Sequence, residues 1–419
     1  MFNVNNKLFE NIISLFSIKG LEYLLAFITF PYLTRVLEVE KFGAIVFAQG
    51  IMQYFVLFTD YGFNLLAPRE IAKNDETKKR GKVFAAIFYG KLLLLVVSMV
   101  IFLFVFFSLC LFKNNAVDLY LYGVWFVMVI GNVIFPIWFF QGIQEMRYIS
   151  FANILARTAS VICIFFFVKT PSDYLLAAFF QAIVPCIAGF YSWIIIYRKY
   201  REVIRRPVWN DVQQQLISGW TIFTSTIAIN MYTASNVIFL GILTNNTVVG
   251  YFSGAKKIVD NINALFAPIS QAVYPHICKL AETSHEKALA FIRKVLFILG
   301  GSSFILSLVL FIFAEEVVWL LLGNGYDQSI LMLRIMSFLP FIISLSNIFG
   351  VQTMLTFGMQ SIFSKILVTA AILNIIAVLP FIYFYQAIGA SSVILFVESY
   401  VTLTMWYIIK KNDLDLFKV

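Results

Sequence analysis

The sequence predicts an all-α polytopic membrane protein, in which twelve transmembrane helices form two parallel-repeat six-helix lobes around a central cavity. Composition is the first observation behind this prediction: 61% of the 419 residues are hydrophobic and only 13% are charged, and the mean hydropathy is +0.87. A soluble chain of this length needs far more polar surface. The other two observations are a series of long apolar stretches and the collection of Lys and Arg in every second gap between them.

The apolar stretches define the predicted membrane spans. Each stretch holds roughly 20 residues or more, which is enough for a helix to cross a hydrocarbon core of about 30 Å. In chain order, the predicted spans are 11–33, 42–66, 83–111, 119–141, 151–168, 174–197, 216–243, 249–275, 294–322, 331–357, 366–385 and 387–409.

The positions of the basic residues predict how these spans are oriented. Most of the 31 Lys and Arg residues lie in the amino terminus, in the gaps after even-numbered spans and in the carboxyl-terminal tail. The other gaps hold Arg35, Lys41, Lys113 and Lys169. Because cytoplasmic loops of membrane proteins carry the excess of Lys and Arg, both termini are predicted to lie in the cytoplasm.

The same topology accounts for the net charge of +9, which in a soluble protein would suggest nucleic-acid binding. Six basic residues lie within 69–82 and five within 198–206, both directly cytoplasmic of predicted spans. Basic residues at such places retain loops in the cytoplasm and contact anionic lipid headgroups. We therefore expect no nucleic-acid partner.

The basic, polar segment 198–215 is the strongest break in composition and divides the spans into six and six. It predicts an N-terminal lobe over 1–200, a cytoplasmic linker over 201–215 and a C-terminal lobe over 216–419. Because six is an even number, both lobes enter the membrane in the same orientation, as parallel repeats do. A shift of 207 positions supports the repeat by matching Gly43, Ala48, Ile51 and Pro68 with Gly250, Ala255, Ile258 and Pro275.

Ionisable residues within the spans are the candidate functional residues, because a charge at mid-bilayer costs at least about 2.5 kcal/mol and usually faces a cavity or a partner. The predicted substrate-cavity residues are four cations, Lys19, Arg157, Lys256 and Lys257. Their excess over the acids predicts a cavity that attracts anions such as a pyrophosphate. Structural salt bridges between pairs of residues are the alternative.

Three acids, Glu22, Asp60 and Asp260, are the candidates for tuning or coupling these charges. Glu22 lies three residues after Lys19, on the same helix face, and Asp260 is within one turn of both lysines of its span. Asp60 has no cation near it in the sequence, so it is a candidate proton carrier or cation ligand, or else a helix-end packing residue. Lys91 has no local acid either, and it is expected either to reach the membrane surface or to line the cavity.

Several classes of function lack their residues in this chain. No Walker A pattern occurs, and the two histidines, His276 and His285, do not form a metal-ligand pattern. The gaps between spans reach at most about twenty residues, which leaves no room for a catalytic domain. The sequence therefore predicts neither an enzyme nor a bound metal or cofactor.

Six segments of the chain resemble one known family. They are TFPYLTRVL at 29–37, DYGFNL at 60–65, PIWFFQG at 136–142, VGYFSGAK at 249–256, PISQAVYP at 268–275 and LPFIISLSN at 339–347. On these segments, which are distributed over both halves, the chain resembles the Wzx-type O-antigen flippases of the polysaccharide transport family, within the multidrug/oligosaccharidyl-lipid/polysaccharide exporter superfamily.

The resemblance implies an exporter of the bacterial inner membrane that moves undecaprenyl-pyrophosphate-linked O-antigen repeat units from the cytoplasmic to the periplasmic leaflet by alternating access. It also implies a cationic central cavity for the head group and a coupling cation, either a proton or sodium. The partners that it suggests are the lipid-linked oligosaccharide, the O-antigen polymerase and the chain-length regulator. No binding residue is transferred from the family, because the cavity charges vary with the sugar carried.

Three rival functions remain open at the level of sequence. A multidrug exporter of the same superfamily would favour acidic and aromatic cavity walls that suit lipophilic cations. A lipid II flippase would typically have more than twelve spans. A scaffold that assembles the glycan-export machinery through its loops would not transport at all.

Overall fold

The computed structural model describes residues 2–73, 76–112, 116–233, 235–412, 414 and 416, and within this part of the chain it is helical almost throughout, with no strand. Within these described ranges, eight stretches of helix are long and apolar enough to cross a membrane. The all-helical membrane class predicted from composition is thus confirmed. A helix satisfies its own backbone hydrogen bonds, and this is why hydrocarbon selects helices for such apolar segments.

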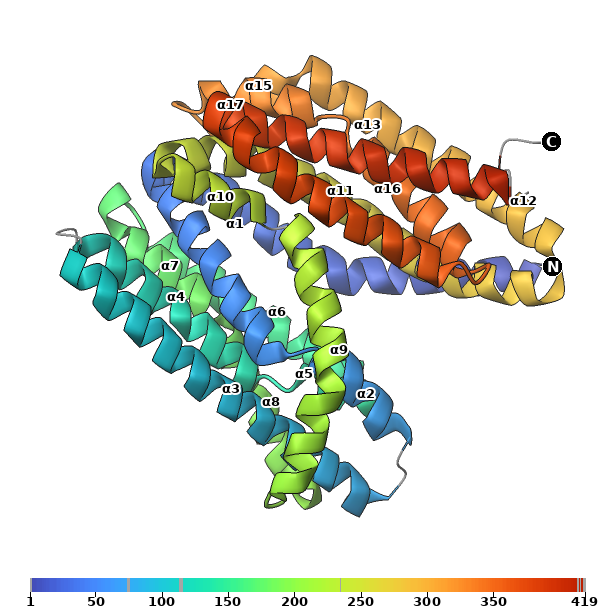
Figure 1. Ribbon diagram of the computed structural model, residues 1–419, viewed down its shortest axis with the longest axis horizontal. Helices are drawn as coiled ribbons and strands as arrows, with labels where there is room; N and C mark the ends of the chain where they lie inside the picture. The colour runs from blue at the N-terminus through green and yellow to red at the C-terminus, as the bar shows by residue number, and fades with distance from the viewer. Residues whose placement is uncertain are drawn as a thin grey trace. The chain divides into compact units, whose positions relative to one another are not determined.

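Two of the long helices each contain a single non-helical residue. In α1 (Phe2–Asp60) this residue is Glu38, with φ 60° and ψ 169°, and in α17 (Gln360–Lys411) it is Gln386, with φ 50° and ψ −126°. Each break divides its helix at the point where the sequence predicts the gap between two spans. The ribbons labelled α1 and α17 in Figure 1 therefore each contain two helical segments.

The chain divides into two compact units, and each is described on its own. Unit 2 comprises Ala44–Asn230, and unit 1 comprises Met1–Gly43 together with Met231–Val419. The division into six and six spans at residues 200 and 216 stays a prediction.

Unit 2 contains α1 from Ala44 onward and the helices that follow it as far as α9. These are α2 (Phe63–Lys73), α3 (Thr77–Phe112), α4 (Ala116–Ile134), α5 (Ile137–Gly142), α6 (Met146–Phe167), the short 3-10 helix η1 (Pro171–Asp173), α7 (Tyr174–Ala182), α8 (Val184–Lys199), the 3-10 helix η2 (Arg201–Val203) and most of α9 (Trp209–Thr233).

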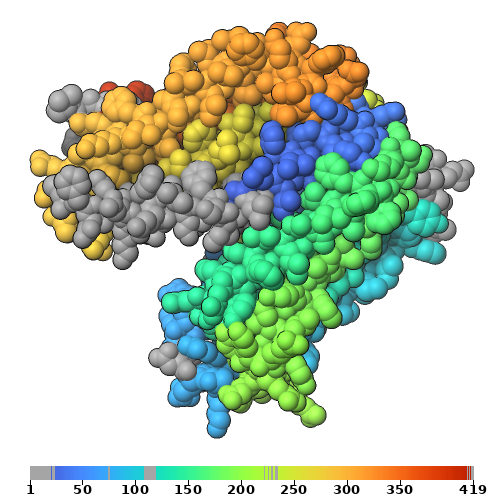
Figure 2. Space-filling model, turned by 180° about the vertical axis from the view of Figure 1, so that it is seen from behind, coloured from blue at the N-terminus to red at the C-terminus, as the bar shows by residue number. Residues whose placement is uncertain are grey.

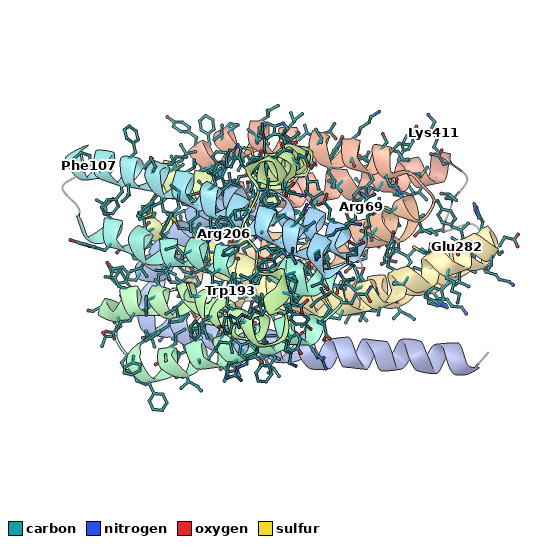
Figure 3. All side chains as sticks on the ribbon, turned by 90° about the horizontal axis from the view of Figure 1, so that it is seen from below. Arg69, Phe107, Trp193, Arg206, Glu282 and Lys411 are labelled. Carbon is teal, nitrogen blue, oxygen red and sulfur yellow. The ribbon has the colours of Figure 1, made fainter. Side chains whose placement is uncertain are left out.

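The core of unit 2 is aromatic. Trp138, Phe139 and Phe140 of α5 are fully buried, and they pack with Phe84 of α3 and with Trp193 of α8, which is labelled in Figure 3. The segment 136–142, one of those that carry the family resemblance, is therefore a packing segment. On the outside of this unit α6, seen in green in Figure 2, exposes Phe166 and Phe167 by 73% and 61%, as expected for a surface that meets lipid.

Unit 1 contains α1 up to Gly43 and the helices from α10 onward. They are α10 (Ser235–Leu243), α11 (Asn246–Thr283), α12 (His285–Val295), the π-helix η3 (Leu296–Gly300), α13 (Gly301–Ile312), α14 (Ala314–Leu321), α15 (Asp327–Met336), α16 (Leu339–Asn347), the π-helix η4 (Ile348–Leu355) and α17.

Side-chain caps begin two neighbouring helices of unit 1. The Asn245 side chain accepts a hydrogen bond from the Val248 amide at the start of α11, and the Ser284 hydroxyl accepts one from the Lys287 amide at the start of α12. Such caps satisfy amides that the first helical turn leaves without a partner. Figure 3 shows Glu282 near the end of α11 and Lys411 at the end of α17, both at one end of unit 1.

Two glycines that the sequence repeat matches with each other form the closest crossing in unit 1. A Cβ atom on Gly43 of α1 would overlap the carbonyl oxygen of Asn246, and a Cβ atom on Gly250 of α11 would overlap the carbonyl oxygen of Val39. The shift of 207 positions that relates Gly43 to Gly250 also relates Val39 to Asn246. The contact is therefore reciprocal, as in an interface with two-fold symmetry.

Candidate functional site

The most deeply buried charge among the described residues is Lys91, in the middle of α3. Its ammonium nitrogen lies 3.0 Å from Oδ1 of Asp60, and the side chains are 2% and 19% exposed. The two residues are 31 positions apart and belong to different helices. Neither has a partner nearby in the sequence, and in the structure each is the other's partner in an ion pair.

The local backbone explains why Asp60 is placed there. Helix α1 ends at Asp60 because Tyr61 and Gly62 have positive φ angles of 50° and 77°. At Gly62 a Cβ atom would also lie 2.6 Å from the side chain of Ile222, so the turn requires glycine. A carboxylate at the carboxyl end of a helix is disfavoured by the helix dipole, and the ammonium group of Lys91 offsets this.

Aromatic and polar contacts join α9 to the residues that follow Asp60 in unit 2. The Tyr61 ring stacks on Phe223 with a centroid distance of 4.7 Å. Nearby, the Gln215 amide donates a hydrogen bond of 2.6 Å to the Glu70 carboxylate, which joins α2 to α9. Asp60 thus lies in a well-packed helix end. Its predicted role in proton or cation coupling is not tested by this geometry and stays a prediction.

The second group of intramembrane charges lies on α11 in unit 1. The ammonium nitrogen of Lys256 lies 2.8 Å from the Asp260 carboxylate, and the side chains are 23% and 47% exposed. Of the two lysines that Asp260 could reach, it therefore pairs with Lys256. Lys257 is an exposed residue beside them, and the opposite face of the helix, with Ala255, is buried.

Three predicted site residues remain, Arg157, Lys19 and Glu22. Arg157 is exposed on α6 of unit 2. The side chains of Lys19 and Glu22 lie outside the part of the chain whose side chains the structure describes. Their predicted pairing stays a prediction, as does the inclusion of all these charges in one cavity.

Two buried polar clusters in unit 1 escaped the sequence analysis, which considered only ionisable residues. In the first, the Asn374 amide of α17 donates a hydrogen bond of 3.2 Å to the Asn236 side chain of α10. In the second, the Gln352 amide of η4 donates hydrogen bonds of 3.0 and 2.9 Å to the backbone oxygen and the hydroxyl of Ser270. Asn236, Asn374 and Gln352 are each 1% exposed. The presence of Asn and Gln inside apolar stretches could have indicated these clusters, because a buried amide group needs a hydrogen-bond partner.

The described residues contain no group of three or more His, Cys, Asp or Glu side chains that could hold a metal ion. The chemistry that this part of the chain offers is therefore that of ammonium, guanidinium, carboxylate and amide groups. Ammonium groups bind phosphate oxygens through charge-assisted hydrogen bonds. Lys256 and Lys257 have exposed surface to do so, whereas Lys91 does not.

Comparisons with known proteins add the following relatives. A family model described as "Polysaccharide biosynthesis protein" matches residues 8–281. Over 407 residues the chain is 35% identical to an Escherichia coli (strain K12) protein named "Putative O-antigen transporter", and the match covers 97% of each chain.

Solved structures of two transporters have a similar fold. An inward-facing multidrug resistance MATE family transporter of the MOP superfamily superposes with a TM-score of 0.73 at 12% identity, covering 95% of this chain and 96% of the other. The lipid II flippase MurJ, in an inward closed conformation, gives a TM-score of 0.70 at 11% identity, covering 95% and 87%. At these identities the likeness establishes the fold alone.

Proposed function

Since the chain belongs to the polysaccharide biosynthesis protein family, we propose that it is a flippase, which moves undecaprenyl-pyrophosphate-linked O-antigen repeat units from the cytoplasmic to the periplasmic leaflet of the inner membrane by alternating access. The observation that carries this proposal is the 35% identity to an O-antigen transporter homologue across 97% of both chains. A match of this extent leaves no large segment over which the two proteins differ in organisation. The function proposed is therefore transport and not catalysis.

The fold features that accompany this proposal are twelve spans in two parallel-repeat lobes. The breaks at Glu38 and Gln386 support the span count, because each divides a long helix where two predicted spans meet. The reciprocal crossing at Gly43 and Gly250 supports the repeat. With both termini in the cytoplasm, the ends of α11 and α17 would lie on the same side of the membrane, in agreement with their place at one end of unit 1.

The physical problem for such a flippase is to carry a charged pyrophosphate and a hydroxyl-rich oligosaccharide past hydrocarbon while the lipid tail stays in lipid. We assign the anion-attracting walls of the passage to Lys19, Arg157, Lys256 and Lys257. Asp260 pairs with Lys256 on the same helix, with 2.8 Å between the ammonium nitrogen and a carboxylate oxygen. An arriving pyrophosphate would compete with Asp260 for the ammonium group, because it carries more than one negative charge and offers more acceptor oxygens.

Glu22 and Asp60 complete the proposal as residues that tune or couple these charges, with a proton or sodium ion as the coupling cation. In the cell, the O-antigen polymerase and the chain-length regulator would act on the exported repeat units. These partners and the coupling ion rest on the family alone.

The test uses a strain that lacks its own O-antigen flippase. We expect the double variant Lys256→Ala/Lys257→Ala to reduce O-antigen display at least tenfold at equal protein level, because it removes both ammonium groups of α11. The matched control is Lys287→Ala/Lys294→Ala on α12, where two exposed lysines lie seven residues apart. Full display by the α11 variant would overturn the assignment of the cationic wall.

Two further measurements separate the rival functions. Flipping of a lipid-linked oligosaccharide by purified protein in vesicles would exclude a non-transporting scaffold. Increased drug sensitivity of a deletion strain, with normal O-antigen display, would instead favour a multidrug exporter. Complementation of strains with defined repeat units would then identify the sugar specificity.

A further inference from the structure

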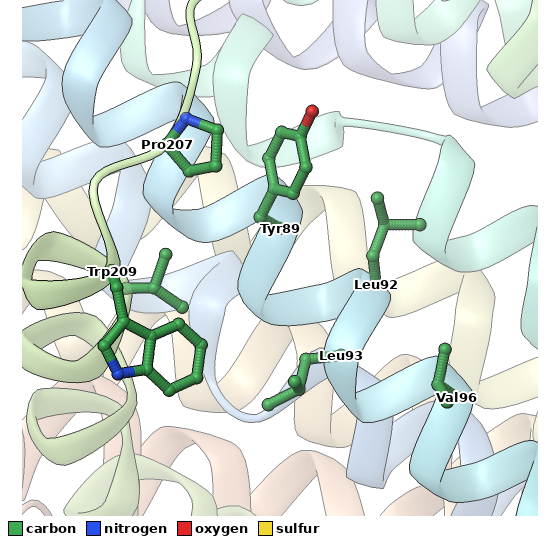
Figure 4. Close-up of a pocket in the computed structure, with 7 residues that line it drawn as sticks. Tyr89, Leu92, Leu93, Val96, Pro207 and Trp209 are labelled. Carbon is green, nitrogen blue, oxygen red and sulfur yellow. The ribbon is translucent and has the colours of Figure 1, made fainter.

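An apolar groove opens on the surface of unit 2, between α3 and the segment that leads into α9. It has a volume of about 360 Å³. One wall is a stripe of α3 that includes Tyr89, Leu93 and Val96, and the other is formed by Pro207 and Trp209 (Figure 4). In Figure 4 Tyr89 and Pro207 lie toward one end of the groove and Val96 lies at the other.

At the end of the groove where Tyr89 and Pro207 lie, each wall is followed by basic residues. On α3, Lys82 precedes Tyr89 by seven residues, so the two side chains share a helix face. On the other wall, Arg205 and Arg206 directly precede Pro207. The Arg205 side chain lies against the backbone of α3, since a Cβ atom on Gly81 would meet its Cδ at 2.9 Å.

The charges at this end favour an anion. Among the described residues, Lys82 and Arg206 are exposed and form no ion pair with a carboxylate. The acids nearby, Glu202 and Asp211, are outnumbered by the basic residues of 198–206. Helix α9 also begins here, at Trp209, and the amino-terminal end of a helix carries a partial positive charge.

The apolar residues of the groove are exposed and are of the types found where a protein surface meets a membrane. Tyr89, Leu93 and Val96 are 45%, 40% and 63% exposed, and Trp209 is 64% exposed. Tyr and Trp are enriched at the level of the lipid headgroups, with hydrocarbon on one side and water on the other. The predicted topology places this basic end at the cytoplasmic surface, because 69–82 and 198–215 are predicted cytoplasmic segments.

From this arrangement we propose that the groove binds an anionic phospholipid of the cytoplasmic leaflet. One acyl chain lies along Leu93 and Val96, the glycerol region lies between Tyr89 and Trp209, and the phosphate is held by Lys82 and Arg206. Basic pockets beside membrane helices recognise anionic head groups in this way. The site is separate from the charged residues of α11 and does not depend on what the protein transports.

Trp209 makes the site measurable. The full-length protein is reconstituted in phosphatidylcholine vesicles, and phosphatidylglycerol or phosphatidylcholine with brominated acyl chains is added as a quencher of tryptophan fluorescence. Because the chain has seven Trp residues, the signal of Trp209 is taken as the difference between the wild-type protein and Trp209→Phe. We expect brominated phosphatidylglycerol to quench this signal at a several-fold lower mole fraction than brominated phosphatidylcholine.

Two variants separate the head-group contacts from the acyl-chain contacts. Lys82→Gln/Arg206→Gln should weaken the apparent affinity for phosphatidylglycerol about fivefold for each charge removed, at low ionic strength. The control Lys287→Gln/Lys294→Gln should leave it unchanged. Leu93→Ser should reduce quenching by both lipids and preserve the preference for phosphatidylglycerol.

Three results would overturn the proposal. The first is equal quenching of wild-type Trp209 by the two brominated lipids. The second is an unchanged preference in Lys82→Gln/Arg206→Gln, which would place the anion elsewhere. The third is unchanged quenching in Leu93→Ser, which would remove the acyl chain from the groove. None of these readouts requires transport, so their outcome is independent of the proposed flippase function.

Discussion

The two units of the molecule hold their helices together in different ways. In unit 2 a buried ion pair, Asp60 with Lys91, joins α1 to α3. In unit 1 the backbones of α1 and α11 meet directly at Gly43 and Gly250, and the ion pair of α11 joins two residues of the same helix at its surface. A Lys–Asp ion pair therefore connects two helices in unit 2, whereas in unit 1 it lies on the surface of a single helix.

Burial decides what each pair can do. Removing one partner of a buried pair leaves an uncompensated charge and costs about 3–5 kcal/mol. An exposed pair within one helix is worth only about 0.3–0.5 kcal/mol. A ligand can therefore displace Asp260 from Lys256 at little cost, whereas displacing Asp60 from Lys91 would destabilise the packing of two helices. On this ground we propose Lys256, and not Lys91, as a lysine that binds the transported anion.

The sharpest test of this comparison is Lys91→Met. Methionine fills a similar volume but leaves the Asp60 carboxylate without its cation. We expect a loss of about 3–5 kcal/mol of stability, measured as a large drop in the midpoint temperature at which the purified protein loses its monomer peak in size-exclusion chromatography.

The double variant Asp60→Asn/Lys91→Met is the matched control, because it removes both charges together. It should recover most of the lost stability, since replacing a whole buried pair is often close to neutral. If the single variant were as stable as the wild-type protein, the pair would not contribute to the packing of unit 2. If the double variant recovered stability and lost O-antigen display, the charge of Asp60 would have a role in transport.

Sequence reasoning predicted the helices but could not predict this pair. The length of an apolar stretch and the basic residues beside it show which solvent surrounds that span. They do not show which other helix the span contacts. The partner of Asp60 lies 31 residues away on another helix, and its position depends on how the helices pack. Likewise, the 207-residue shift matched Gly43 with Gly250 from sequence, but their direct contact became visible only in three dimensions.

The backbone crossing of unit 1 is the next test in order of size. Gly43→Ala should cost about 1–3 kcal/mol, because the new methyl group overlaps the Asn246 carbonyl oxygen and α1 must move away from α11. Gly250→Ala should cost a similar amount, because its contact with Val39 is the reciprocal one. Both costs are measured by the same thermal assay.

Gly301→Ala in α13 of unit 1 provides the control for the crossing. Nothing lies within 4 Å of a Cβ atom at this position, and alanine is a better helix former than glycine. Its stability should therefore be equal to or slightly above that of the wild-type protein. Unequal losses for Gly43→Ala and Gly250→Ala would argue against a symmetric crossing of the two repeats.

The smallest effect is expected for Lys256→Gln, and it completes the comparison. Glutamine keeps a polar side chain of similar reach while removing the charge from a pair that is 23% and 47% exposed, so stability should change by no more than about 0.5 kcal/mol. O-antigen display should nevertheless fall, because the proposed role of this lysine is to attract the pyrophosphate. A stability loss as large as that of Lys91→Met would mean that Lys256 is a structural residue, and the distinction between a packing pair and a binding pair would then have to be abandoned.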